Sequence, residues 1–316
     1  MKPTNEIKNV ICEFGIIISL YFIPIALPFL GGLCAIFTPL PVFFYRMRLG
    51  GKISLITIGA ISLFIFCISD NRFYSIIFLW LIILGFILSE LTEAKFSLES
   101  VITKGAIYGS FIAFLFIFLY ANAVDKGAIE LTAGFVNKNL NIILTLYKEA
   151  GIPKSEIELF TASMGRLEFI IVRIMPGIIL SGALLISVIT TLTARGSFAK
   201  KIPLPHFGNP NCWRAEDNFV WYFIVSAVLI LLPIRDWRLI GVNGLIVLFN
   251  IYFFQGWAII SYYLEKKKIN KMVKPFLFVV VISIKYLLFA LVAAGLFDTW
   301  FDFRKIRNKA SVKESP

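Results

Sequence analysis

One stretch, residues 239–274, constrains what this chain can fold into more than any other. It begins as a continuous apolar run, LIGVNGLIVLFNIYFFQGWAIISYYL, and ends in the basic segment EKKKINKMVK. The apolar part exceeds the roughly 20 residues that a helix needs to cross a bilayer. Lysines directly behind such a run are typical of its cytoplasmic end. Asn243, Asn250 and Gln255 lie inside the run, where lipid offers their amides no hydrogen bonds. The stretch predicts a spanning helix with polar groups inside it.

Composition extends this prediction to the whole chain. Of its 316 residues, 59% are hydrophobic, whereas a soluble domain has about 45–50% apolar residues even with glycine counted. Most of the apolar runs also lack the polar face that a surface helix of a soluble protein needs. We therefore expect an all-α, polytopic transmembrane helical bundle rather than a large soluble helical protein.

The net charge of +12 would suggest a nucleic-acid partner in a soluble protein. Here Lys and Arg lie mostly at the ends of apolar runs, where they indicate topology and contact with anionic lipid. We expect the lipid bilayer as partner, and no nucleic acid. The 4 cysteines and the single histidine, His206, have no spacing typical of a metal site or a disulfide framework, so no metal or cofactor is expected.

The apolar runs predict eight or nine spans in an integral membrane domain, 1–303, followed by a polar basic tail, 304–316. Six spans fall in 11–194, and the additional ones fall in 218–297. The expected spans are 11–30, 33–45, 53–69, 73–88, 105–124, 169–194, 218–233, 239–264 and 275–297. With the N-terminus inside, the inside loops hold most of the basic residues. Nine crossings would put the basic tail outside, whereas its charge favours the inside, so the side of the tail and the completeness of the last span stay open.

Residues 125–167 form the one long region between predicted spans, and its apolar side chains follow an amphipathic pattern. Gly151 and Pro153 interrupt that pattern, and Ser155 with Glu158 has the spacing of a capping box, which marks a helix start. We expect two helices that lie on the membrane surface or cap the bundle. A structural cap is favoured over a functional lid.

Small side chains recur every four residues at Gly105, Gly109 and Ala113. Such spacing lets another helix approach closely. Packing inside the protein is the favoured interpretation, and contact with a partner helix is the alternative.

Polar side chains inside the predicted spans are the candidate ligand-binding residues, because such groups usually face a bundle interior or a wet cavity. They are Arg173, Asn243, Asn250, Gln255 and Lys285. For the asparagines, hydrogen bonding between helices is the structural alternative. The sequence contains no H-E-x-x-H and no nucleotide-binding G-x-x-x-x-G-K-[ST]. We therefore expect no catalytic residue and no enzyme.

Three segments resemble the YybS-like family of bacterial membrane proteins, a domain of unknown function. They are FTPLPVFFYRMRLGGK at 37–52, the run from Asn243 through Gln255-Gly256 to IISYYLEKKK, and GLFDTWFDFRK at 295–305. The first six spans are also distantly similar to the S components of energy-coupling-factor vitamin transporters and to MreD-type cell-shape proteins. That similarity implies a small helical bundle with a site near the outer face, in which 125–167 is a candidate gate and Arg173 a candidate site residue. The spans after Ala194 are additional to this six-span plan.

Two functions follow as expectations, both in the bacterial cytoplasmic membrane. The first is a transporter-like or small-ligand-binding protein without its own nucleotide hydrolysis, motivated by the buried polar residues and the resemblance. The alternative is a scaffold that recruits another membrane protein, motivated by the small-residue spacing and the basic loops.

Overall fold

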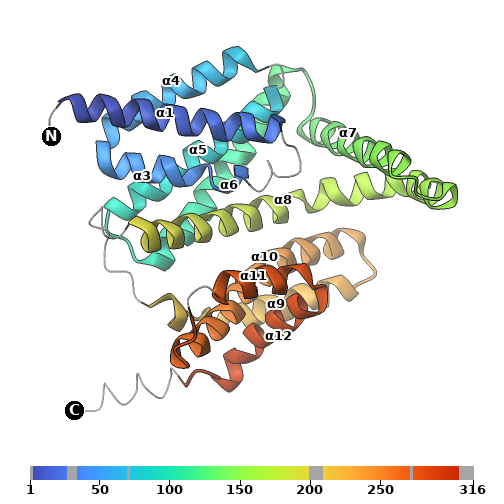
Figure 1. Ribbon diagram of the computed structural model, residues 1–316. Helices are drawn as coiled ribbons and strands as arrows, with labels where there is room; N and C mark the ends of the chain where they lie inside the picture. The colour runs from blue at the N-terminus through green and yellow to red at the C-terminus, as the bar shows by residue number, and fades with distance from the viewer. Residues whose placement is uncertain (1–2, 27–33, 70–71, 199–208, 271–272, 306–316) are drawn as a thin grey trace. The chain divides into compact units, whose positions relative to one another are not determined.

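The computed structural model describes residues 3–26, 34–69, 72–198, 209–270 and 273–305. Regular structure in these ranges is helical throughout, as expected for an all-α bundle. The chain divides into two compact units, Met1–Pro205 and His206–Pro316 (Figure 1).

The first unit is a bundle whose core lies among its first four described helices. The buried side chains Ile17, Val42, Ile61 and Ile82 pack together there, one from each helix. In chain order, the helices of this unit are α1 (Pro3–Ala26), α3 (Pro39–Leu49), α4 (Gly51–Ile68), α5 (Arg72–Glu93), α6 (Leu98–Ala123), α7 (Ala128–Glu149) and α8 (Lys154–Phe198).

Small residues of α6 sit where this helix contacts α5 and α8. A Cβ atom on Gly105 would lie 3.3 Å from the Ser187 hydroxyl of α8, and one on Gly109 would lie 2.8 Å from a methyl carbon of Leu84 in α5. The structure thus places Gly105 and Gly109 in contacts within the unit, and Ala113, one turn further on, is half-buried. Residues later in the sequence of α6 contact residues earlier in the sequence of α5 and α8, so both neighbours run antiparallel to α6.

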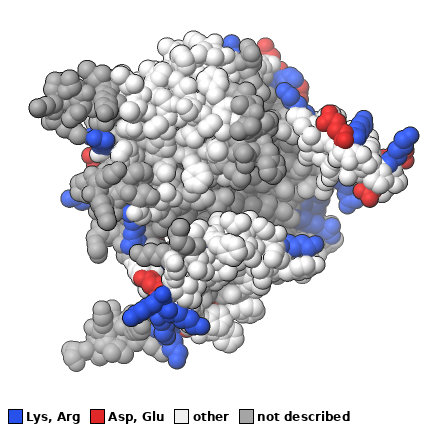
Figure 2. Space-filling view, viewed as in Figure 1, with Lys and Arg blue, Asp and Glu red and all other residues white. Residues whose placement is uncertain are grey.

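α7 and the start of α8 form a helical hairpin, which we call the α7–α8 hairpin. The Tyr147 ring packs on that of Phe160 with centroids 5.2 Å apart, and the Asn137 amide donates to the Glu168 carboxylate at 3.1 Å. Gly151 turns the chain between the helices at a φ of 69°, which favours glycine. The hairpin projects beyond the other helices of the first unit, and side chains of both charges cover it (Figures 1 and 2).

The region 125–167 was expected to hold two helices that are separate from the next span. Two helical segments are present, but the second is not separate from that span. α8 begins at Lys154, so Ser155 lies inside its first turn rather than capping it, and the helix continues without interruption for 45 residues through Pro176. The expected surface helix and the expected span 169–194 are thus one element. Hydropathy changes along α8, but the helix continues through this change, and Pro176 does not end it although a proline removes a helical hydrogen bond.

The second unit is built around one long helix, α10 (Arg235–Lys266). α10 packs against α9 and α12, and the buried Leu248, Tyr252 and Phe253 form the centre of this core. The other elements of the unit are the 3₁₀ turn η1 (Pro210–Cys212), α9 (Asn218–Leu231), α11 (Val273–Ser283) and α12 (Lys285–Phe301).

The predicted span at 275–297 is not one helix, which corrects that expectation. It breaks at Ile284 into α11 and α12, which are bent by 108°. The Phe289 ring of α12 packs on Phe249 of α10 at 5.9 Å between centroids, and the Tyr263 hydroxyl donates to the Phe303 carbonyl at 2.7 Å. α12 therefore runs in the same direction as α10 and returns the chain to the end of α10 from which α11 starts. Both ends of the pair thus lie near the same end of α10, which is the geometry of a re-entrant loop.

Eight or nine spans are not confirmed. Among the described residues, five helices are long and apolar enough to cross a membrane, or six if the bent α11–α12 pair counts as one. α3 and α9 hold 11 and 14 residues. At 1.5 Å per residue they measure about 16 and 21 Å, less than the roughly 30 Å of a hydrocarbon core.

Candidate functional site

The five residues predicted to bind a ligand differ in their surroundings. Arg173, in the first unit, is exposed, and its guanidinium lies 3.3 Å from the centroid of the Phe169 ring. Asn243 donates to the Leu239 carbonyl of its own helix at 2.8 Å. Asn250 is half-buried in α10.

Lys285 was expected midway along a span, where its charge would need a partner. It is instead the first residue of α12, directly after the break, and it is exposed. Its ammonium lies 5.2 Å from the centroid of the neighbouring Tyr286 ring. Of the five candidates, only Gln255 is fully buried and joins a polar cluster.

That cluster centres on an ion pair between Asp298 of α12 and Arg304 just beyond the helix. Both side chains are 0% exposed, and Arg304 Nη2 donates to Asp298 Oδ2 at 2.7 Å. The Gln255 amide nitrogen, on α10, donates to the same oxygen at 3.2 Å. Two charges out of water are stable only with such geometry and further hydrogen bonds, and removing one partner leaves an uncompensated charge.

The cluster also holds the irregular segment that enters α9. Arg304 Nη1 donates to the carbonyls of Asn211 and Trp213 at 2.9 and 2.7 Å. Gln255 Oε1 accepts from the buried Ala215 N–H at 3.3 Å. Backbone outside a helix needs such partners when it is buried in a membrane protein. Gln255 and Arg304 therefore link this segment to α10 and to the end of α12 through hydrogen bonds.

A second arginine, Arg214, secures the end of α12. Its Nη2 donates to the Thr299 carbonyl at 2.6 Å and to the Asp217 carboxylate at 2.8 Å. The last carbonyls of a helix receive no hydrogen bond from an N–H group of the same helix, and they carry the negative end of its dipole. A guanidinium at this position satisfies one of them. Asp302 then ends the helix in the left-handed region, at a φ of 41°.

Some polar atoms of this region are buried without a hydrogen-bond partner in the described part of the chain. They are Asp298 Oδ1, Thr299 Oγ1, the Tyr252 hydroxyl, Arg214 Nε and Arg304 Nε. Buried polar groups are rarely left unpaired, which sets these atoms apart from the rest of the cluster. The described residues contain no group of three or more His, Cys, Asp or Glu that could hold a metal.

The first unit carries its own buried arginine. The Arg46 side chain on α3 is 5% exposed; its Nε donates to Glu90 Oε1 of α5 at 2.6 Å, and it also pairs with Glu93. Gly51 lies beside the pair: a Cβ there would be in ordinary contact, at 3.4 Å, with both the Arg46 guanidinium and the Glu90 carboxylate. The pair joins α3 and α5 at the end of the bundle where α6 begins.

Two hollows in the described structure are lined mainly by apolar side chains. One, of ≈ 60 Å³, lies between α4 and α5 and includes Ser62 and Ser75. The other, of ≈ 390 Å³, lies among α9, α10 and α12 and is lined by Ile230, Val242, Leu245, Ile246, Phe249 and Phe289. Neither includes Arg173, Asn243 or Asn250.

Sequence reasoning missed Arg46, Asp298 and Arg304, although a signal for them existed. Arg46 lies in the segment 37–52, and Asp298 and Arg304 lie in the segment 295–305, both of which carry the family resemblance. Ending the last span at 297 assigned Asp298 and Arg304 to the polar end of the chain. In the sequence, an aspartate and an arginine six residues apart at a helix end look like a solvated tail; the structure shows that they pair directly and that Gln255 of α10 binds the same carboxylate.

Long apolar helices, with buried polar groups that pair inside the protein, define a membrane-embedded, multi-pass helical protein. The chain belongs to the family described as Predicted membrane protein (DUF2232), whose model matches residues 15–299. It is similar to the Uncharacterized protein YybS of Bacillus subtilis (strain 168), with 23% identity over 286 residues that cover 86% of this chain and 88% of that protein. The resemblance to the YybS-like family is thus confirmed, whereas the distant similarity to S components and MreD-type proteins stays a prediction. No solved structure is significantly similar to this chain.

Proposed function

We propose that this protein is an assembly factor of the bacterial cytoplasmic membrane, and that its α7–α8 hairpin binds a helix of a partner protein outside the membrane. The observation that carries the proposal is a row of exposed apolar side chains on a hairpin that projects from the bundle. Phe135, Ile142 and Leu146 are 37%, 50% and 55% exposed.

The positive-inside rule supports an outer location for the hairpin. Arg46, Lys95 and Lys104 lie at or near the end of the first unit where α6 begins, and Arg195 of the antiparallel α8 lies at the same end. This basic end belongs in the cytoplasm. α6 has 26 residues, or about 39 Å, which is enough to cross the bilayer and bring the chain to the hairpin on the other side.

The spacing of the exposed row fits a helix as its partner. Phe135, Asn139, Ile142 and Leu146 follow the pattern i, i+4, i+7, i+11, which forms a seam along one face of a helix. Val136 and Leu140, on the next face, are buried against α8. The hairpin is therefore folded through one apolar face and presents a second.

A photoreactive amino acid at Ile142, introduced into the full chain in cells, tests the proposal. The matched control is Lys148, an exposed position on the opposite, polar face of α7. We expect a discrete cross-linked product from position 142, lost when Leu146→Glu is added, and little from position 148. Equal cross-linking from both positions, or a product that Leu146→Glu leaves unchanged, would overturn the proposal. A product of two copies of this chain would identify the partner as the protein itself.

Ligand handling is the second candidate, and one observation favours it. Asp298 Oδ1, Thr299 Oγ1 and the Tyr252 hydroxyl are buried and unpaired near a re-entrant helix pair, and transporters build sites at interrupted helices. Thermal unfolding of the purified protein across vitamins and their precursors tests this role. Stabilisation of the wild type that Thr299→Val abolishes would support it. A series without any stabilising compound would count against it.

A further inference from the structure

We infer that the ends of α10 and α12 together form a binding site for an anionic phospholipid. The end of α10 carries Lys266, Lys267 and Lys268, and Lys305 lies shortly after the end of α12. All four side chains are exposed, and in the described part of the chain none of them makes an ion pair. Figure 2 shows a group of basic side chains at this end of the second unit.

The fold, rather than the local sequence, brings these lysines together. The α11–α12 pair is re-entrant, and the hydrogen bond from Tyr263 to the Phe303 carbonyl, 2.7 Å long, joins the last turn of α10 to the residues just after α12. The buried pair of Asp298 and Arg304 holds the same junction from inside. The backbone φ is 52° at both Lys268 and Lys305, so the chain turns at each of these two lysines.

Nearby carboxylates offset only part of this charge, since Glu265 and Asp302 supply two negative charges against four positive ones. Glu265, the residue before the three lysines, accepts a hydrogen bond from the Asn211 amide. Asp302 closes the end of α12 and already has a partner. The four ammonium groups thus leave a local excess of positive charge, and each lysine near an anionic surface contributes about 1 kcal/mol of attraction.

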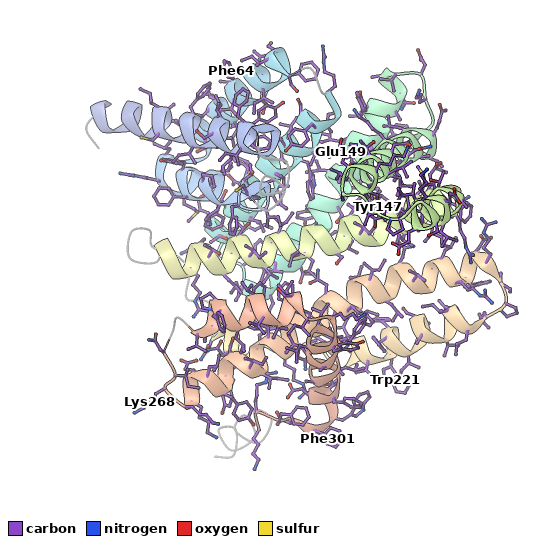
Figure 3. The ribbon with its side chains drawn as sticks, turned by 45° about the vertical axis from the view of Figure 1, so that its right-hand side comes forward. Phe64, Tyr147, Glu149, Trp221, Lys268 and Phe301 are labelled. Carbon is purple, nitrogen blue, oxygen red and sulfur yellow. The ribbon has the colours of Figure 1, made fainter. Side chains whose placement is uncertain are left out.

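Exposed aromatic rings at the end of α12, close to Lys305 in the chain, favour a lipid over a soluble anion. Trp300 and Phe301 are 55% and 67% exposed, and the rings of Phe301 and Phe303 stack at 5.9 Å between centroids. Figure 3 labels Lys268 and Phe301 on the surface of the second unit. Rings of this kind lie at headgroup depth in membrane proteins. A phospholipid satisfies both features, because its phosphate can meet the lysines while its acyl chains cover the rings.

Native mass spectrometry of the purified full chain, with phosphatidylglycerol and phosphatidylcholine of identical acyl chains, tests the site. The test variant carries Lys266→Ser, Lys267→Ser and Lys268→Ser. The control removes the same charge from the first unit by Lys126→Ser, Lys148→Ser and Lys154→Ser, all at exposed positions. We expect the wild type and the control to retain phosphatidylglycerol preferentially, and the test variant to bind it roughly 10- to 100-fold more weakly at low salt.

Replacing the same three lysines by arginine should restore binding, which separates loss of charge from loss of fold. Trp300→Ser with Phe301→Ser should weaken phosphatidylglycerol binding although it leaves the charge unchanged. Equal retention of phosphatidylcholine, or equal losses in the test and control variants, would overturn the inference. Inorganic phosphate that displaces the lipid at similar concentration would identify a free-anion site and would also overturn it.

Discussion

Gly256 and Gly295 bring the backbones of α10 and α12 into direct contact. A Cβ atom on Gly295 would lie 2.8 Å from the Gly256 amide nitrogen, and one on Gly256 would lie 3.0 Å from the Leu291 carbonyl carbon. These atoms belong to backbones, so neither can rotate away as a side chain would. The two glycines set the distance at which Gln255 reaches Asp298, and the polar cluster depends on them.

Gly295→Ala should therefore destabilise the protein although alanine is the better helix former. Overpacking costs about 1–3 kcal/mol, and here the obstruction is backbone. The control is Gly182→Ala in α8, where the added Cβ meets nothing within 4 Å; helix propensity alone would stabilise it by up to about 1 kcal/mol. Thermal unfolding in detergent should move in opposite directions for the two variants. An unchanged midpoint for Gly295→Ala would contradict the close contact.

Removal of one member of the buried ion pair should cost more than removal of both. Arg304→Met leaves the Asp298 charge buried and uncompensated, with an expected loss of about 3–5 kcal/mol. Asp298→Leu combined with Arg304→Met removes both charges and should recover a large part of that loss. Unfolding midpoints of the single and double variants give the coupling. Additive losses would show that the two side chains do not act as a pair.

Gln255→Leu should destabilise the protein by about 1–3 kcal/mol, because it leaves the buried Ala215 N–H without an acceptor and removes a donor to Asp298. Arg173→Ala and Asn243→Leu are informative comparisons. Arg173 is exposed and Asn243 is half-buried, whereas Gln255 is fully buried, so each should change the unfolding free energy by less than Gln255→Leu does. A ranking in which Gln255→Leu has the smallest effect would show that the hydrogen bonds of Gln255 do not stabilise the fold.

The re-entrant pair predicts that both of its ends face one compartment. In a variant whose natural cysteines are replaced by serine, Lys268→Cys and Lys305→Cys should react with a membrane-impermeant maleimide only in inverted vesicles. Asn141→Cys on the α7–α8 hairpin should react in intact spheroplasts. Labelling of positions 268 and 305 from opposite sides would show that α11 and α12 together cross the membrane.

Hydropathy predicted the all-helical class and the single long helix at 239–264, because the bilayer imposes length and composition on each span separately. It could not reveal the break at Ile284, where neither glycine nor proline interrupts the apolar run. For the same reason Lys285 was placed at mid-span. The partners of Gln255 and Arg46 lie 43 and 44 residues away, and no local pattern encodes such distant pairs.

α8 is one uninterrupted helix that runs from the projecting hairpin to the far end of the first unit. Its 45 residues correspond to about 67 Å of helix, and α8 contacts α6 at Gly105 and Gly109. Pro176 omits one hydrogen bond but does not end the helix. Phe160 in the hairpin and Arg195 near the far end therefore belong to one uninterrupted helix, so a displacement of the hairpin acts directly on the element that ends at the opposite end of the first unit.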